Sequence, residues 1–343
     1  MKKRNYAIDF FRMVFMIIIC VHHFQGSIDA TFIHSGYLCV EFFFILSGFY
    51  LFQSFQKNKE QDALQYTIKK VKRMYPHYIF SLIICLLAVV CRQVIKNDFD
   101  VVNIIYKILA ELFMVQNIGF FDGGLNTPIW YISVLIIGGY IIYGILKRDE
   151  KVFLRILGPI FIIFTFNLIK SNSNTIENWN SINGLYLPLL RGMADLMIGC
   201  LLAEILNRYS NKIDCLIGKR KIIAFIAEIS TYVLLAYIIL FQTDYEMYCL
   251  ILFPLLIIFA YSQKSISSKL FNREIYKNNG DLTYAMYLNH SAVNMIMSFA
   301  YEILLSRIFN AGIMTIIYIV IVIIYSYFTN KIVKYLTNRF RIK

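Results

Sequence analysis

Long runs of mainly apolar residues recur along the whole chain and restrict its possible folds more than any other feature. The runs at 8–24, 222–241 and 313–328 approach the roughly 20 residues that a helix needs to cross a hydrocarbon layer about 30 Å thick. With 59% hydrophobic residues among 343, the chain has more apolar surface than one soluble core buries, so the surplus must face lipid. Continuous runs fit helices better than the alternating strands of a barrel. We therefore predict an all-α, polytopic integral membrane helical bundle whose surroundings are a lipid bilayer.

Eleven runs are candidate spans, but the distribution of positive charge fits only ten. They are 8–24, 36–54, 77–91, 102–118, 129–146, 152–169, 186–206, 222–241, 246–262, 282–305 and 311–330. If 102–118 crossed, the loop at 117–124 would be cytoplasmic without any Lys or Arg, and every later loop would change sides. With 102–118 as an interfacial or re-entrant helix, 27 of the 34 Lys and Arg residues fall on one side. The charges therefore predict about ten transmembrane helices, with both termini in the cytoplasm.

Other features of composition narrow the class of protein further. The net charge of +13 is the usual surplus of cytoplasmic loops, so we expect no nucleic-acid partner. The seven cysteines show no C-x-x-C spacing, and no metal site is predicted. The basic start at residues 2–4 lacks a cleavage site and is interpreted as the flank of a retained first helix. Since the loops are short, we expect one transmembrane domain over 5–335 and a short basic cytoplasmic tail over 336–343.

Ionisable side chains within predicted spans are costly in lipid and are candidates for function. Arg12 and His23 are eleven residues apart on the first helix, about 16 Å and close to three turns, so they share one face. Histidine is the usual general base near neutral pH, which makes His23 a catalytic candidate. The alternative for Arg12 is a side chain that reaches the membrane interface. Glu41, six residues before Ser47, must be protonated, paired or in a wet cavity.

Four further clusters carry polar residues at span ends or inside spans. The basic cluster of Lys70, Lys72 and Arg73 is either a topology signal or a site for phosphate groups. The other three are listed here in chain order: Trp130 with Ser133 at an expected outer end, Arg191 with Asp195 one helical turn apart, and Tyr284, Tyr287 and His290 along another span. Taken singly, the tyrosines are most often packing residues.

Taken in order, these elements resemble the acyltransferase-3 family of membrane-bound O-acyltransferases, which modify bacterial surface polysaccharides. The matching elements are Arg12 with ten residues before His23, the run 41–49 (EFFFILSGF), the run 70–76 (KVKRMYP), the run 130–133 (WYIS), the stretch 191–199 and the run 283–290 (TYAMYLNH). The sequence departs from the family in having Lys70 where arginine is usual and Leu135 where one branch has a glutamate. It is most similar to the branch that includes polysaccharide O-acetyltransferases.

The resemblance implies an enzyme of the bacterial cytoplasmic membrane that transfers an acetyl group from acetyl-CoA, or another acyl group from its CoA ester. The acceptor would be a hydroxyl of a cell-surface or capsular polysaccharide, or of its lipid-linked precursor, at the outer face. It implies His23 and Arg12 as catalytic residues, with His23 a general base or an acyl carrier. The implied donor-binding residues are Lys70, Lys72 and Arg73, and no tightly bound cofactor is expected. The implied supporting residues are Glu41, Ser47, Trp130, Ser133, Arg191, Asp195, Tyr284, Tyr287 and His290. The alternative function is a transporter or flippase of a glycolipid or exopolysaccharide intermediate.

Overall fold

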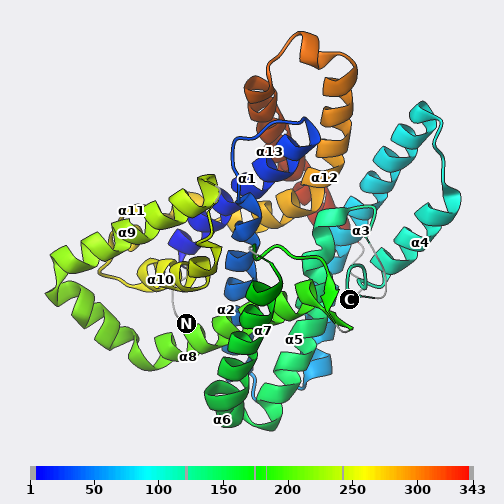
Figure 1. Cartoon of the computed structure of the whole chain (residues 1–343). Coiled ribbons are helices and arrows are strands. Elements are labelled where there is room, and N and C mark those ends of the chain that lie inside the picture. The colour runs from blue at the N-terminus through cyan, green and yellow to red at the C-terminus, as the bar shows by residue number, and fades with distance from the viewer. Residues whose placement is uncertain (1–4, 120–122, 174, 183, 242, 340–343) are drawn as a thin grey trace. The chain divides into compact units, whose positions relative to one another are not determined.

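The computed structural model describes residues 5–119, 123–173, 175–182, 184–241 and 243–339, and these are almost entirely helical (Figure 1). Within them, one small antiparallel ladder joins β1 (Ser181–Ile182) to β2 (Leu185–Tyr186). The prediction of an all-α membrane bundle is therefore confirmed. The basic residues Lys2, Lys3 and Arg4 and the last four residues of the predicted tail lie outside the described part.

Each of the ten predicted spans falls on a helix, but the helices at 77–91, 186–206 and 311–330 extend more than two turns beyond the predicted runs. The long helices are α1 (Tyr6–Ser27), α2 (Cys39–Lys57), α3 (Ala63–Lys96), α5 (Trp130–Arg148), α7 (Gly158–Asn172), α8 (Leu187–Lys219), α9 (Lys221–Leu240), α10 (Cys249–Tyr261), α12 (Asn279–Ile303) and α13 (Ala311–Arg339). Within the described residues, seven of them, α1, α2, α3, α5, α7, α9 and α13, are long and apolar enough to cross a membrane, counting the short turns that precede α2, α5 and α7. Of the other three, α10 is shorter, and α8 and α12 carry buried polar side chains.

Several short elements connect these helices. They are η1 (Gly36–Leu38), η2 (Thr127–Ile129), α6 (Glu150–Val152), the π-turn η3 (Phe153–Leu157), η4 (Glu246–Tyr248), α11 (Ile266–Phe271), η5 (Glu274–Tyr276) and η6 (Leu305–Arg307).

The helix α4 (Val101–Leu112) is the run that the charge distribution excluded from the spans. Its 12 residues rise only about 18 Å, too little to cross the hydrocarbon layer. One face of α4 is exposed and apolar, with Val102 80% exposed and Phe113, just after the helix, 76% exposed. These features fit an interfacial helix. The helix ends before residue 118 because Met114 and Asn117 adopt positive φ angles of 55° and 52°.

The chain forms two compact units, which are described separately. The first contains residues 1–14, 34–68 and 134–279, and the second contains 15–33, 69–133 and 280–343. In the first unit α2 and α8 are in backbone contact. A Cβ atom on Gly48 would lie 1.9 Å from the Leu196 carbonyl oxygen, and one on Gly199 would lie 1.9 Å from the Ile45 carbonyl oxygen. Only glycine allows helices to approach so closely.

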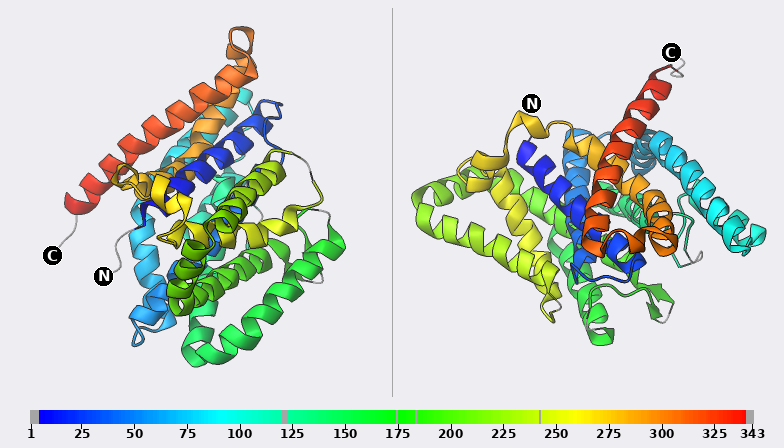
Figure 2. Two further views of the ribbon diagram at one scale, coloured as in Figure 1. Left: turned by 90° about the vertical axis from the view of Figure 1, so that its left-hand side faces the viewer. Right: turned by 90° about the horizontal axis from the view of Figure 1, so that it is seen from above.

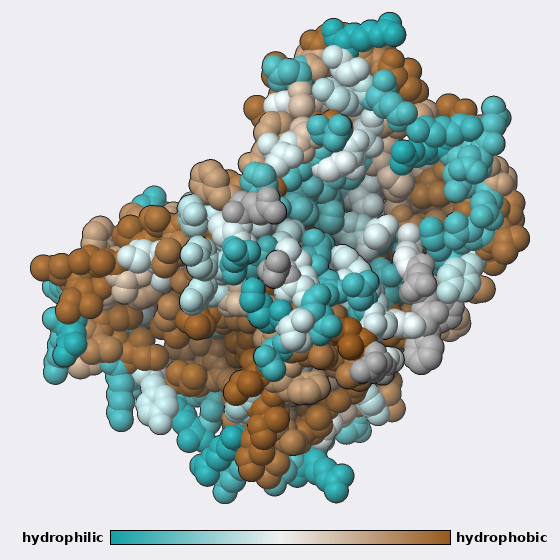
Figure 3. Space-filling model, viewed as in Figure 1, coloured by the Kyte–Doolittle hydropathy of each residue, from teal (hydrophilic) through white to brown (hydrophobic). Residues whose placement is uncertain are grey.

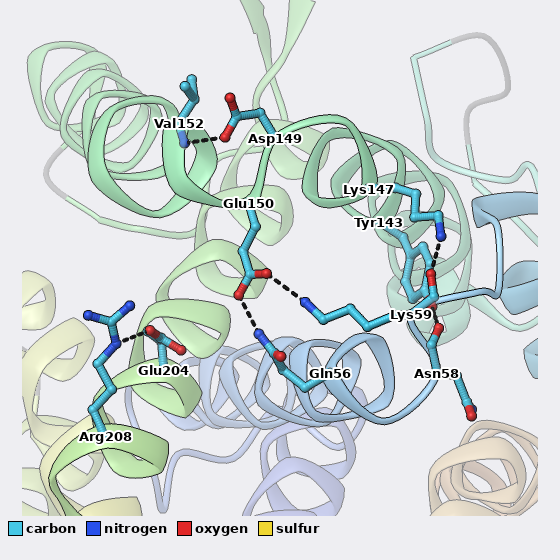
Figure 4. A network of polar contacts seen from close by, with 10 residues as sticks. All are labelled: Gln56, Asn58, Lys59, Tyr143, Lys147, Asp149, Glu150, Val152, Glu204 and Arg208. Atoms are coloured by element: carbon cyan, nitrogen blue, oxygen red, sulfur yellow. Dashed lines mark hydrogen bonds and ion pairs between the residues drawn. The ribbon is translucent and has the colours of Figure 1, made fainter.

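At one end of the first unit a polar network joins α2, α5 and α6 (Figure 4). Glu150 accepts hydrogen bonds from the Gln56 side chain and from Lys59 Nζ, the latter at 2.6 Å. The Tyr143 hydroxyl donates to the Asn58 carbonyl oxygen at 3.5 Å. The network therefore joins the segment that follows α2 to the segment between α5 and α7.

The exposed surface of α9 has the character expected of a lipid-facing helix. Ile222, Ile223 and Val233 are 77%, 61% and 60% exposed, and the space-filling view is largely brown over this helix (Figure 3). Apolar side chains exposed in such numbers need a nonaqueous neighbour.

In the second unit α12 and α13 form a long antiparallel pair (Figure 2). Asn289 donates to Thr329 Oγ1 at 2.7 Å across this pair. The Ser81 hydroxyl of α3 donates to the Leu288 carbonyl oxygen at 2.6 Å and ties α12 to α3. The histidine-bearing part of α12 is therefore held from two sides.

Candidate active site

The predicted site residues are divided between the two units. The first unit contains Arg12, Glu41, Ser47, Arg191 and Asp195, and the second contains His23, Lys70, Lys72, Arg73, Trp130, Ser133, Tyr284, Tyr287 and His290. Helix α1 carries both Arg12 and His23 without a break, so the helical spacing assumed for this pair holds. Each unit has a polar cluster of its own.

The cluster of the first unit is a buried ion pair between α2 and α8. Arg191 Nε lies 2.6 Å from Glu41 Oε1, and the two side chains are 3% and 0% exposed. Asp195 lies beside both partners, so the expected helical pair of Arg191 and Asp195 is part of a triad that includes Glu41. Arg12 is instead 3.4 Å from Asp9 on its own helix. Glu41 is therefore the partner of Arg191, and the triad joins two helices that already touch.

The cluster of the second unit centres on two histidines from α1 and α12. The ring centroids of His23 and His290 are 5.3 Å apart, with His23 partly exposed and His290 fully buried. His290 Nδ1 lies 2.7 Å from the Tyr287 carbonyl oxygen, which can only accept a hydrogen bond. Nδ1 therefore carries the proton, and Nε2 keeps its lone pair. This Nε2 atom is buried and has no hydrogen-bond partner among the residues that the structure describes.

Asn294, one turn beyond His290 on α12, completes this cluster. Its amide nitrogen donates to the His23 carbonyl oxygen at 3.2 Å and to Ser27 Oγ at 3.0 Å, which uses both amide hydrogens. Its Oδ1 atom is buried and accepts no hydrogen bond from any described residue. Sequence reasoning missed Asn294, although its spacing of four residues from His290 places it on the same helical face. Within the described residues this cluster therefore contains two buried acceptors whose hydrogen bonds are not satisfied.

The two tyrosines of this face position α12. The Tyr284 hydroxyl donates to the Met74 carbonyl oxygen at 3.1 Å, and the Tyr287 hydroxyl donates to the Pro128 carbonyl oxygen. The Tyr287 ring also meets the Tyr131 ring at 5.6 Å. These bonds hold α12 against α3 and against the start of α5, so the tyrosines act here as packing and docking residues.

The remaining predicted residues lie on three helices. Trp130 and Ser133 are buried in the first turn of α5, and Ser47 is partly buried on α2. Of the basic cluster on α3, Lys70 is partly buried, whereas Lys72 and Arg73 are exposed. Arg73 also lies close enough to Tyr284 for an electrostatic interaction. The exposed pair is accessible to a ligand from solution.

A second buried network in this unit was missed because its acid lies outside the spans. Glu111 at the end of α4 is fully buried, and its Oε1 accepts the Asn126 backbone N–H at 2.8 Å. The Asn126 side chain donates to the Leu288 carbonyl oxygen at 2.8 Å, so Glu111 is linked to α12. Burial raises the pKa of Glu111 to about 7, against the opposing effect of its backbone hydrogen bonds. The sequence signal was a glutamate within an otherwise apolar run.

Metal binding by these side chains has no geometric support in the part of the chain that the structure describes. No group of three or more His, Cys, Asp or Glu residues there is arranged to hold a metal ion.

Fold and site together define a multi-pass membrane protein with a pair of buried polar clusters, one ionic and one built on histidines. The sequence matches the model of the acyltransferase-3 family, described as an acyltransferase domain, over residues 5–330. Since the match covers nearly the whole chain, the protein belongs to this family and is a membrane acyltransferase. No curated protein and no solved structure matched the chain.

Proposed function

We propose that this protein transfers an acetyl group from cytoplasmic acetyl-CoA to a hydroxyl of a cell-surface or capsular polysaccharide, or of its lipid-linked precursor. The reaction would take place at the outer face of the bacterial cytoplasmic membrane, with both termini of the chain in the cytoplasm. The family match supports acyl transfer, and the positive charge of the loops supports this orientation.

The observation that carries the proposal is the pair of unpartnered acceptors beside His23. In the described part of the chain, His290 Nε2 and Asn294 Oδ1 both lack a donor, and an acceptor hydroxyl would supply one. A sugar presents several hydroxyl groups, so one can bond to these acceptors while another approaches His23.

In the reaction, His23 takes the proton of the attacking hydroxyl. The hydroxyl oxygen forms a bond to the thioester carbonyl carbon, the carbon–sulfur bond breaks, and the proton passes from His23 to the leaving CoA sulfur. If His23 instead carries the acetyl group, a ring nitrogen forms the first bond to carbon and the acceptor oxygen then displaces it. Both routes need His23 with a free lone pair, and both place His290 and Asn294 as positioning residues.

The donor is assigned to the basic residues on α3. Lys70, Lys72 and Arg73 would bind the phosphates of acetyl-CoA, because exposed Lys and Arg side chains form charge-assisted hydrogen bonds with phosphate. In this scheme Arg12 also acts on the cytoplasmic side, where the donor binds. We assign Arg12, which pairs with Asp9 on its own helix, to the pyrophosphate of the donor, because Glu41 is the partner of Arg191.

The test is transfer of labelled acetyl from acetyl-CoA to a surface glycan by purified protein in lipid nanodiscs. His23→Ala should reduce the rate about 10²–10⁴-fold. The matched control is His77→Ala, which removes another histidine of the second unit, bonded to Asn330 at 3.1 Å, and should transfer at the wild-type rate. A well-folded His23→Ala protein that still acetylates would refute the catalytic role. Failure of the wild-type protein to label any glycan would refute the function itself.

The donor site has a separate test. Replacing Lys70 and Arg73 with Gln should raise the apparent KM for acetyl-CoA, whereas Lys151→Gln, at an exposed position of the first unit, should leave it unchanged. Equal KM values in the two proteins would restore the topology-only interpretation of the cluster.

A further inference from the structure

A pocket of about 360 Å³ in the first unit is lined only by side chains that form hydrogen bonds. Its lining residues are His34, Ser35, Tyr37, Thr175, Thr243, Asp244 and Glu246. They come from the loop before α2, the loop between α7 and α8, and the loop between α9 and α10. Every lining residue carries a polar group in a chain with 59% hydrophobic residues, so this pocket needs a specific explanation.

One buried carboxylate holds the three loops together. Glu246 is 3% exposed, and its Oε1 accepts from the Tyr37 hydroxyl and from Ser35 Oγ at 3.5 Å. Its Oε2 accepts the Ile176 backbone N–H at 2.8 Å. The Ser35 backbone N–H also donates to the Ile239 carbonyl oxygen at 3.0 Å. The pocket is thus preformed, because each loop that lines it is fixed to another.

The groups that remain at the mouth are those that bind hydroxyls. Asp244 and His34 are exposed, and Thr243 is partly exposed beside them. A carboxylate accepts hydrogen bonds from two neighbouring hydroxyls, and threonine and histidine both donate and accept. Since no Lys or Arg lines the pocket and two carboxylates do, phosphate and other anionic groups are disfavoured.

Aromatic side chains on two of these loops favour the same class of ligand. Trp179 is 43% exposed, and Tyr245 and Tyr248 are 55% and 57% exposed. Their rings offer flat apolar faces that suit the C–H faces of a sugar ring, with polar atoms at the edge. Hydroxyl, imidazole and carboxylate groups in the pocket, with exposed rings on two of the loops that form it, therefore fit an uncharged carbohydrate better than a peptide or a lipid tail.

We propose that this loop pocket binds an uncharged sugar residue of the acceptor glycan. The inference rests on the proposed function, which places the acceptor on the outer side. All three loops also fall on the outer side in the charge-based topology, and the structure brings them together through Glu246 and Ile176. The pocket would give the enzyme affinity for a particular stretch of glycan without a part in the chemistry.

The test compares the double variant Asp244→Ala/Thr243→Val with Asp98→Ala, which removes an exposed aspartate from another loop assigned to the outer side. Initial rates are measured against glycan concentration at saturating acetyl-CoA. Loss of two hydrogen bonds should raise the apparent KM for the glycan about ten-fold and leave kcat and the KM for acetyl-CoA unchanged. Asp98→Ala should match the wild type. An unchanged glycan KM in the double variant would overturn the proposal while leaving acyl transfer intact.

A second measurement does not depend on catalysis. Saturation-transfer NMR of the wild-type protein should show contacts to methyl glycosides of glucose, galactose or N-acetylglucosamine, and none to glucuronate. The double variant should lose these contacts. If the wild type shows no glycoside contact, or binds only Ca²⁺ in calorimetry, the pocket is not a sugar site. If glycoside contacts are present but no glycan is ever acetylated, the proposed function fails and the sugar site stands.

Discussion

Replacing Arg191 with Met should destabilise the protein more than any surface substitution, because it removes the only cation of a buried triad. Its guanidinium bonds Glu41 Oε1 at 2.6 Å, and Asp195 lies next to both. Methionine keeps most of the side-chain length but leaves two carboxyl groups together without a counter-charge. Removing one partner of such a buried pair costs about 3–5 kcal/mol in the free energy of unfolding.

Two further variants distinguish the cost of an unpaired buried charge from the cost of lost packing in the free energy of unfolding. Glu41→Gln leaves Arg191 with Asp195 as its counter-ion, so it should cost only about 1–3 kcal/mol, the value of a lost charged hydrogen bond. The double variant Glu41→Gln/Arg191→Met leaves one acid that can take up a proton and become neutral. It should recover most of the stability that Arg191→Met loses.

The assay is equilibrium unfolding in mixed detergent micelles, followed by tryptophan fluorescence and by loss of helical circular dichroism. Arg208→Met serves as the control, since Arg208 is 57% exposed and pairs with Glu204 one turn earlier on α8, well beyond the buried triad. It should change stability by less than about 1 kcal/mol. If Arg191→Met unfolds at the same denaturant concentration as Arg208→Met, the argument from buried charge is wrong. If the double variant is as unstable as Arg191→Met, the cost lies in lost packing.

Three other substitutions test separate features. Gly199→Ala should lower the free energy of unfolding by about 3 kcal/mol, because the added Cβ would meet a backbone oxygen. Its control is Gly139→Ala, whose Cβ would lie 3.7 Å from its nearest neighbour and which should be neutral or stabilising. Equal melting temperatures of the two variants would contradict the close helix contact. Glu111 has a folded-state pKa of about 7 against an ordinary value of 4.5, so the proton it retains stabilises the fold at low pH, and this contribution disappears as the pH rises through 7. The stability difference between wild type and Glu111→Gln should therefore change between pH 4.5 and 8, and a constant difference in thermal melts would exclude the raised pKa. Asn126→Ala should lower the free energy of unfolding by about 1–3 kcal/mol, because it breaks two side-chain hydrogen bonds, to Ser81 and to the Leu288 carbonyl oxygen. Asn103→Ala, at an exposed position, should leave the free energy of unfolding unchanged. Similar unfolding curves for the two variants would argue against a stabilising role of the Asn126 side chain.

The sequence was sufficient to predict the helices, because lipid imposes a length and a composition on every span. It was also sufficient to separate α4 from the spans, since Lys and Arg are distributed by side. The end of α4 shows the limit of prediction from hydropathy and charge. Its end at Leu112 depends on backbone angles at Met114 and Asn117, for which the run of apolar letters has no signal.

The pairing of side chains could be predicted only where it is local. Arg191 was expected to meet Asp195, four residues away, yet its hydrogen-bonding partner Glu41 lies 150 residues earlier in the chain. A buried charge needs a partner, but spacing along one helix cannot say which other helix supplies it. The same limit applies to Glu246, whose role in fixing three loops appears only when those loops are folded together.

The bond from His290 Nδ1 to the Tyr287 carbonyl oxygen also bears on proton conduction. A histidine conducts protons when one ring nitrogen receives a proton and the other passes it on. A peptide carbonyl cannot take the proton onward, so His290 can only return it from the nitrogen that accepted it. If the protein transfers acetyl groups at the outer face, as we propose, it must do so without a proton leak through the bundle. The bond to the Tyr287 carbonyl oxygen gives His290 a fixed tautomer that does not relay protons from one side to the other.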